Sequence, residues 1–387
     1  MADIYFDNSA TTKISQGARD KMNEVMDKLY GNPSSLHKLG VEAERVVSEA
    51  RSRILTSLGI TRGVRGELVF TSGGTEANNL AILGSVFAKK RNGSEKILTT
   101  QGEHASVENT LNHLEKSGFK VVRVPTKNGE IDLDFIKENG RDAIVATFMH
   151  VNNETGALYD IAGAFEAVRS VAPGVVCHAD CVQSYMKVKL SKKSIGADLI
   201  TLSAHKINGA KGTGALYIAP EILKAKKISP ILFGGGQEEN IRSGTENVYG
   251  ISAFGQASYE HYSKLSEEIE NMRELRGYIV GLVSKVVGAK VNEPVNSAPH
   301  IISLTVKGIR SETMLHFLSS KGIYVSSGSA CSSHSVSGSS QALLSFGLSV
   351  SEADSTIRIS LCPENTRDEA DKLYSALIEA SARLARR

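Results

Sequence analysis

The chain has 387 residues, of which 41% are hydrophobic and 22% are charged, and its formal net charge is +3. This is ordinary globular composition, and the length allows one large α/β domain with an appendage or two to three smaller domains. It contains no run of five basic residues, no stretch of 18 apolar residues and no leader-like start, so we expect a cytoplasmic protein that binds neither nucleic acid nor a membrane.

Between residues 67 and 220, short apolar runs rich in β-formers alternate with amphipathic stretches. This alternation predicts βα units and a largely parallel sheet with both faces covered by helices. The predicted strands are residues 67–72, 96–100, 120–125, 143–150, 175–180, 197–205 and 214–220.

Near residue 251 the pattern changes, and residues 252–287 read as one long amphipathic helix. Strand-like pieces follow at 300–306 and 355–361, and a final helix is expected over 367–385. These elements predict a smaller α+β domain that is joined to the large one through the long helix.

The four cysteines are Cys177, Cys181, Cys331 and Cys362, and no two of them form a CxxC pair. Neither a structural zinc site nor another metal site is therefore expected, and free thiols are favoured over disulfides. Cys331 differs from the others because it lies in SSGSACSSHSVSGSS, residues 326–340, a serine-rich stretch that gives a thiol little to pack against.

Polar side chains follow five of the predicted strands at their carboxyl ends, which is where open parallel sheets bind ligands. Polar side chains at five strand ends are more than chance would place there. The groups are Thr71 to Glu76, His104, Asn152 to Glu154, Asp180 with Gln183, and Ser203 to Lys206.

TSGGTEANN, which starts at Thr71, is a glycine-hinged turn that opens a helix. Its free backbone N–H groups favour an anion site, although a tight capped turn is an equally good interpretation of the motif alone. It is neither a dinucleotide fingerprint nor a P-loop, which disfavours nicotinamide and ATP.

Lys206 follows a predicted strand directly, with Ser203 and His205 beside it, as a Schiff-base lysine near a cofactor phosphate requires. Taken alone, Lys206 would more often be a surface lysine. Asp180 ends a buried strand and needs a cationic partner, either a protonated pyridine nitrogen or a structural Lys or Arg. His104 could stack on an aromatic ring, or it could be an ordinary core or surface histidine. Jointly, these elements supply the four functions that a pyridoxal phosphate pocket requires.

Short motifs spread over nearly the whole chain are YFDNSATT, YGNPSSLH, FTSGGTEANNLAI, MHVNNETG, HADCVQS, SAHKINGAKGTGALY, GGGQEENIRSGTENV, SSGSACSS and STIRISL. In these motifs and their order, the sequence resembles cysteine desulfurases of the NifS/IscS type, pyridoxal phosphate enzymes of the class V aminotransferase family. The resemblance implies an α/β, fold type I transferase whose large domain, residues 16–255, has a mainly parallel seven-stranded sheet. Residues 1–15 and 256–387 would form a smaller α+β domain that carries the mobile cysteine loop 326–340.

The resemblance also implies pyridoxal 5′-phosphate as cofactor, L-cysteine as substrate and a homodimer. Lys206 would form the Schiff base, Asp180 would pair with the pyridine nitrogen, Gln183 would bond the phenolic oxygen, and His104 would stack on the ring. Asn153 would contact both cofactor and substrate, and Arg358 would bind the substrate carboxylate with it. The phosphate would be held by Gly74, Thr75, Ser203, His205 and, from the partner subunit, Thr245.

In this interpretation Cys331 attacks the sulfur of the substrate, becomes a persulfide and carries the sulfur to an acceptor protein, with His104 as the candidate for proton traffic. The loop would supply the mobility for that transfer. The acceptor could serve iron–sulfur cluster assembly or tRNA and cofactor thiolation. Because the chain ends soon after its last helix, where housekeeping relatives continue with a scaffold-docking extension, a dedicated acceptor such as a tRNA-thiolating enzyme is also expected.

Two departures from the family pattern are Cys181, where many relatives have alanine or glycine, and Ala210, where proline is common. Cys181 is expected to be a packing residue, with modulation of the cofactor as the alternative.

The alternative functions for the whole protein are a selenocysteine lyase or another class V enzyme, and a sulfur carrier or scaffold without turnover. A transaminase has no use for Cys331 on a mobile loop, and a carrier would not need Lys206, Asp180 and His104.

Overall fold

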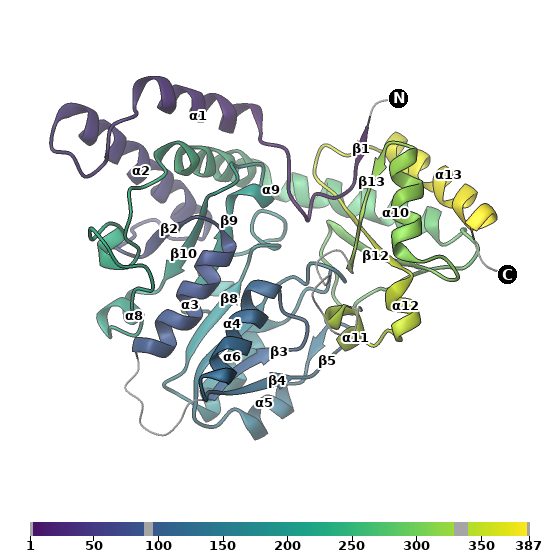
Figure 1. Cartoon of the computed structure of the whole chain (residues 1–387), viewed down its shortest axis with the longest axis horizontal. Coiled ribbons are helices and arrows are strands. Elements are labelled where there is room, and N and C mark those ends of the chain that lie inside the picture. The colour runs from purple at the N-terminus through teal and green to yellow at the C-terminus, as the bar shows by residue number, and fades with distance from the viewer. Residues whose placement is uncertain (1–2, 89–95, 329–339, 385–387) are drawn as a thin grey trace.

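A seven-stranded sheet forms the centre of the larger part of the molecule in the computed structural model, which describes residues 3–88, 96–328 and 340–384 (Figure 1). Every residue of its five strands nearest the β2 edge, from β2 to β7, is buried, so both faces of the sheet are covered as predicted. In spatial order the strands are β2 (Leu68–Thr71), β10 (Gly214–Ile218), β9 (Leu199–Ser203), β8 (Val176–Asp180), β7 (Ala143–Met149), β3 (Lys96–Thr100) and β4 (Lys120–Val124).

The prediction of a mainly parallel sheet of seven strands is confirmed. Strand β10 is the exception, because it runs antiparallel to both of its neighbours, β9 and β2. Residues 204–213, which connect β9 to β10, are too few for the helical crossover that a parallel return needs.

Helices pack on this sheet and against one another. α3 (Gly74–Ala88) and α4 (Ala105–Lys116) each begin at a strand exit that also carries predicted site residues. α6 (Ile161–Val171) follows β7 after a loop, and α5 (Leu133–Asn139) packs on α6. Two further helices, α1 (Gln16–Lys28) and α2 (Lys38–Ser57), were not among the predicted elements, and both pack on the long helix α9 (Val248–Val283).

The long helix α9 reaches from the first hydrophobic core into a second one (Figure 1). Its first turns, with Val248 and Phe254, belong to the core of the seven-stranded sheet, whereas Leu275, Ile279 and Val283 belong to the second core. The predicted helix is therefore confirmed, starting a few residues earlier than expected. None of the helices within the described ranges combines the length and the apolar character that a membrane crossing requires.

The second core surrounds a four-stranded sheet in which β12 and β15 are the central strands. The predicted bounds of the two domains, residues 16–255 for the large one and 1–15 with 256–387 for the small one, stay a prediction. Ile4 and Phe6, from the start of the chain, are part of this core. Its strands, in order, are β11 (Ala289–Val291), β12 (Ile301–Val306), β15 (Thr356–Ser360) and β14 (Ser326–Ser327), and the helices beside them include α10 (Ser311–Ser320) and α13 (Arg367–Leu384).

The start of the chain crosses from the second core to the seven-stranded sheet. β1 (Ile4–Tyr5) pairs in parallel with β13 (Ile323–Tyr324), and Asp7 then forms a bridge with Ser360 of β15. A few residues later, the backbone N–H of Thr12 donates to the carbonyl of His205. The N-terminal segment, residues 5–12, therefore passes between the two sheets, beside the ends of β9 and β15.

The contact between α2 and α9 gives a test of this packing. A Cβ added at Gly255 would lie 2.6 Å from Cα of Ala50, so Gly255→Ala should force the helices apart. We expect it to lower the free energy of unfolding by about 1–3 kcal/mol, measured by urea denaturation. Gly277→Ala in the same helix is the control. A Cβ there has no neighbour within 4 Å, so helix propensity should raise stability by up to about 1 kcal/mol, and equal effects of the two variants would contradict the close approach.

Candidate active site

A cavity of about 430 Å³ lies at the carboxyl ends of β7, β8 and β9. A hollow of about 620 Å³ beside α2 contains none of the predicted site residues, and its Arg51 and Glu238 already pair with each other. Two predicted residues are not in the smaller cavity: Thr245 is exposed elsewhere on this chain, and Cys331 lies outside the described residues. All the others line it: Gly74, Thr75, His104, Asn153, Asp180, Gln183, Ser203, His205, Lys206 and Arg358.

Asp180, the last residue of β8, places a buried carboxylate at one wall of the cavity. Its Oδ2 accepts a hydrogen bond from Nδ2 of Asn78 at 2.7 Å, and its Oδ1 accepts one from the backbone N–H of Val182 at 2.9 Å. Within the part of the chain that the structure describes, it forms no ion pair. Because amide donors carry no net charge, this buried carboxylate favours a cationic group in the cavity.

His104 is the N-cap of α4, and its ring faces the same cavity. Its Nδ1 accepts the backbone N–H of Ser106 at 3.2 Å and lies 2.8 Å from the Ser106 hydroxyl. Burial lowers the pKa of His104, with the charge of Asp180 opposing this shift and that of Lys206 adding to it. Since Nδ1 is an acceptor, the neutral ring carries its proton on Nε2.

Asn78 connects Asp180 to His104, and sequence reasoning missed it. Its Nδ2 donates to Oγ of Ser106 at 2.8 Å as well as to Asp180, so one side-chain amide joins the carboxylate to the partner of the imidazole. Asn78 follows Gly74 by four residues in α3. Spacing of i, i+4 puts both on one helix face, which is the signal in the sequence that could have identified it.

The opening turn of α3 and the end of β9 meet at one side of the cavity. The hydroxyl of Ser203 is buried and has no hydrogen-bond partner among the described residues. A Cβ at Gly74 would lie 2.8 Å from Cγ2 of Val182, so only glycine fits there without a shift. The first N–H groups of a helix have no intrahelical acceptor, and together with the Ser203 hydroxyl they can hold an anion.

His205 lies next to this group, with Nδ1 3.2 Å from Oγ1 of Thr11. Burial, together with the nearby charges of Lys206 and Lys211, lowers the pKa of His205 to about 4. At neutral pH it is therefore an uncharged ring that can donate or accept a hydrogen bond.

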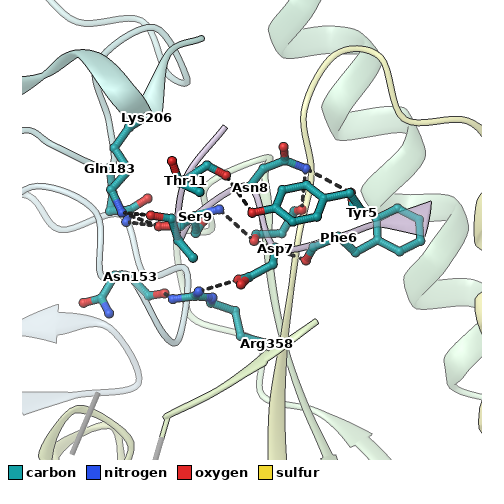
Figure 2. Close-up of polar contacts among 12 residues, drawn as sticks. Tyr5, Phe6, Asp7, Asn8, Ser9, Thr11, Asn153, Gln183, Lys206 and Arg358 are labelled. Atoms are coloured by element: carbon teal, nitrogen blue, oxygen red, sulfur yellow. Dashed lines mark hydrogen bonds and ion pairs between the residues drawn. The ribbon is translucent and has the colours of Figure 1, made fainter. Parts of the chain in front are cut away.

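Lys206 projects from the turn after β9 towards the N-terminal segment (Figure 2). Its Nζ donates to the carbonyl oxygens of Ser9 at 2.5 Å and Ala10 at 2.9 Å, and Nε2 of Gln183 donates to the Ser9 carbonyl at 2.9 Å. Ser9 and Ala10 also line the cavity. Backbone carbonyls of a segment almost 200 residues away in sequence therefore hold the amine, which no local motif could predict.

Arg358 of β15 comes from the second sheet and closes the other side of the cavity (Figure 2). Its Nη1 donates to the carbonyl of Asn153 at 2.9 Å, and its Nη2 donates to Oδ1 of Asp7 at 2.8 Å. Only 8% of the Arg358 side chain is exposed. The cavity thus holds a guanidinium group at one end and the anion turn and lysine at the other.

Three cysteines lie within the described ranges, and burial raises the pKa of each thiol, to about 12 for Cys177 and Cys362. Cys181 is fully buried, which supports its expected role in packing. In the same ranges, no group of three or more His, Cys, Asp or Glu residues is placed to hold a metal ion.

Glu103, the neighbour of His104, fixes the exit of β3 against β7. Its Oε1 accepts hydrogen bonds from the hydroxyl of Thr100 and, at 3.0 Å, from the backbone N–H of Met149. Burial raises the pKa of this carboxyl group to about 8, so the folded protein holds it protonated at neutral pH.

Glu103→Gln keeps the acceptor oxygen and removes the titration. Because the pKa of Glu103 is higher in the folded than in the unfolded chain, its contribution to stability is complete below about pH 4.5 and is lost as the pH rises through 8. Relative to wild type, the variant should therefore gain a few kcal/mol of stability between pH 5 and pH 8, measured by denaturant unfolding across that range. A difference in stability that stays constant with pH would contradict the shift.

Comparison with known proteins agrees with this geometry. Residues 4–373 match the family model described as Aminotransferase class-V. The cysteine desulfurase IscS 1 of Archaeoglobus fulgidus is 36% identical over 376 residues, which are 96% of this chain and 95% of that protein. The cysteine desulfurase IscS of Dictyoglomus turgidum is 36% identical over 379 residues, 97% of this chain and 93% of the other.

Solved structures give the same result. A structure described as a NifS-like protein matches with a TM-score of 0.90 at 32% identity, covering 98% of this chain and 99% of that one. A structure titled "SspA in complex with cysteine" matches with a TM-score of 0.79 at 29% identity, covering 94% and 100%. The resemblance inferred from the motifs is confirmed, and the chain belongs to the class V aminotransferase family.

Proposed function

We propose that this chain is a cysteine desulfurase that uses pyridoxal 5′-phosphate to convert L-cysteine to L-alanine and transfers the sulfur, through Cys331, to an acceptor protein. The observation that carries the proposal is the meeting of Lys206, Asp180, His104 and the opening turn of α3 in one cavity. Relatives named cysteine desulfurases at 36% identity over nearly the whole chain support it.

The residues of the cavity fit this cofactor. Asp180 is a buried carboxylate with two amide donors and no ion pair in the described ranges, and a protonated pyridine nitrogen would supply its cation. The unpartnered Ser203 hydroxyl and the first N–H groups of α3 would hold the phosphate, and the absence of a side chain at Gly74 lets this turn pack closely on Val182. When bound, pyridoxal phosphate supplies an electron sink for the charge that develops at the substrate Cα.

The chain's own groups would then bind the substrate and move its protons. Arg358, with Asn153 beside it, would bind the α-carboxylate of L-cysteine. Nζ of Lys206 would take the proton from Cα and return one to the product. His104, neutral and protonated on Nε2, would hold or pass a proton close to the reacting sulfur.

Cys331 would attack the Sγ of the substrate as a thiolate, so that an S–S bond forms while the Cβ–Sγ bond breaks. The electron pair of the broken bond would stay on the three-carbon skeleton, which becomes L-alanine after protonation, and Cys331 would retain the sulfur as a persulfide. The described residues that precede it support this role. Ser326 lines the cavity and pairs with Arg358 in the β14–β15 ladder, so the chain enters the segment of Cys331 beside the proposed carboxylate site. The acceptor would be an iron–sulfur scaffold or a thiolating enzyme.

We also propose a homodimer. Thr245 is exposed and does not line the cavity of its own chain. This position fits a residue that reaches the phosphate site of a second copy, and size-exclusion chromatography with light scattering would test the assembly.

Lys206→Ala tests the cofactor assignment. Borohydride reduction of the wild-type protein incubated with pyridoxal phosphate should attach the cofactor covalently at Lys206, and the peptide mass would identify the site. The variant should acquire no such label and should lose L-alanine formation, because no other amine is placed to replace Nζ among the residues that the structure places at the cavity. Labelling of the wild-type protein at a different lysine would contradict the assignment.

Cys331→Ser tests the sulfur acceptor. Production of L-alanine from L-cysteine with a reductant should fall by about 100-fold or more, while the absorbance of the bound cofactor is retained. Cys362→Ser is the matched control, because Cys362 does not line the cavity and should retain activity. Full turnover by Cys331→Ser would refute the transfer step.

A further inference from the structure

The N-terminal segment, residues 5–12, is fixed against β15 by a set of hydrogen bonds (Figure 2). The backbone N–H of Ser9 donates to Oγ of Ser360 at 2.9 Å, and Nδ2 of Asn8 donates to the Ser360 carbonyl at 3.1 Å. The hydroxyl of Tyr5 closes the segment on itself by donating to the carbonyl of Thr11 at 2.9 Å. These contacts leave Asp7 with little freedom and place its carboxylate beside Arg358.

The guanidinium group of Arg358 has two fixed acceptors on two different nitrogens. Nη1 is held by the carbonyl of Asn153, and Nη2 is held by Oδ1 of Asp7. One acceptor would leave a planar group free to turn about that hydrogen bond, whereas two acceptors define its plane. Each of these two nitrogens carries a second N–H, which neither of the two acceptors uses. The group therefore retains N–H donors for a ligand in the cavity that Arg358 lines.

The acceptor oxygen of Asp7 matters because the guanidinium that it holds is buried. The Arg358 side chain is 8% exposed and that of Asp7 is 21% exposed, so the pair is largely removed from water. Without Asp7, the guanidinium would be a buried cation with one backbone acceptor, and it would be free to turn towards water or towards other anions. With Asp7, it is oriented before any ligand arrives, which lowers the cost of ordering it on binding.

We propose that Asp7 is a positioning residue for substrate binding, which orients Arg358 so that its free N–H donors receive the α-carboxylate of the amino-acid substrate. The proposal rests on the proposed function, and in particular on the carboxylate-binding role of Arg358. It makes the start of the chain part of the substrate site, although Asp7 itself need not touch the substrate.

The test uses the holoenzyme and measures L-alanine formation against L-cysteine concentration. Asp7→Ala should raise KM by roughly 10-fold or more and leave kcat within about threefold, since a hydrogen bond to a charged group is removed from the binding site only. Asp7→Asn keeps an oxygen that accepts from Nη2, and its KM should stay within about threefold of wild type. Asp3→Ala is the matched control, because Asp3 is exposed and its one hydrogen bond among the described residues is the one that it accepts from the hydroxyl of Tyr324, so its kinetics should be those of wild type.

If Asp7→Ala is recovered unfolded or without cofactor, Asp7→Ser, whose hydroxyl is too short to reach Nη2, supplies the same comparison. A wild-type KM in Asp7→Ala or Asp7→Ser would overturn the proposal, as would an equal rise in KM for Asp7→Asn. Arg358→Ala distinguishes an error in the proposed carboxylate site from an error in the role of Asp7. If Arg358→Ala leaves KM unchanged, the carboxylate site itself is wrong. If KM rises strongly in Arg358→Ala but not in the Asp7 variants, only the role of Asp7 is refuted.

Discussion

The burial of the Asp180 carboxylate is the constraint on which the site depends. β8 lies in the middle of the seven-stranded sheet with every residue buried, so its last side chain places a largely buried carboxylate at the wall of the cavity. Asn78 and Val182 satisfy its oxygens with amide donors but bring no positive charge. A buried carboxylate with these two neutral donors favours a cationic group in the cavity beside it. The protonated pyridine nitrogen of the proposed cofactor would supply that positive charge, so we interpret the cavity as a binding site and not as a packing defect.

The site also depends on how two hydrophobic cores are joined. Lys206 comes from the seven-stranded sheet and Arg358 from the four-stranded one, and the distance between them follows from the placement of the sheets. Two elements fix that placement: the long helix α9, which contributes side chains to both cores, and the N-terminal segment, which contacts Lys206 and Arg358 directly. The start of the chain therefore holds side chains that lie about 200 and 350 positions away in the sequence.

Much of the fold could be predicted because it is encoded in local patterns. Apolar runs marked the strands of the large sheet, and the long amphipathic pattern marked α9 within a few residues. The direction of β10 was not predicted, since a buried strand has the same composition whichever way it runs. The short connection to β9 is the signal in the sequence that favours the antiparallel pairing. The helices α1 and α2 have recognisable helical patterns but lie outside the βα alternation on which the prediction relied.

The site divides in the same way. Residues at or just after the end of a strand, such as Asp180, His104 and Lys206, are determined by the sequence itself, because parallel strands that end together bring these positions to one edge of the sheet. Asp7 and Ser9 were decided only by the tertiary structure. Their hydrogen bonds to Arg358 and Lys206 join positions about 350 and 200 residues apart, and no local propensity or spacing encodes such a contact. The sequence by itself determined which groups the cavity contains. The packing of the two cores around the N-terminal segment decided how those groups are oriented, because their hydrogen-bond partners are neighbours only in the folded chain.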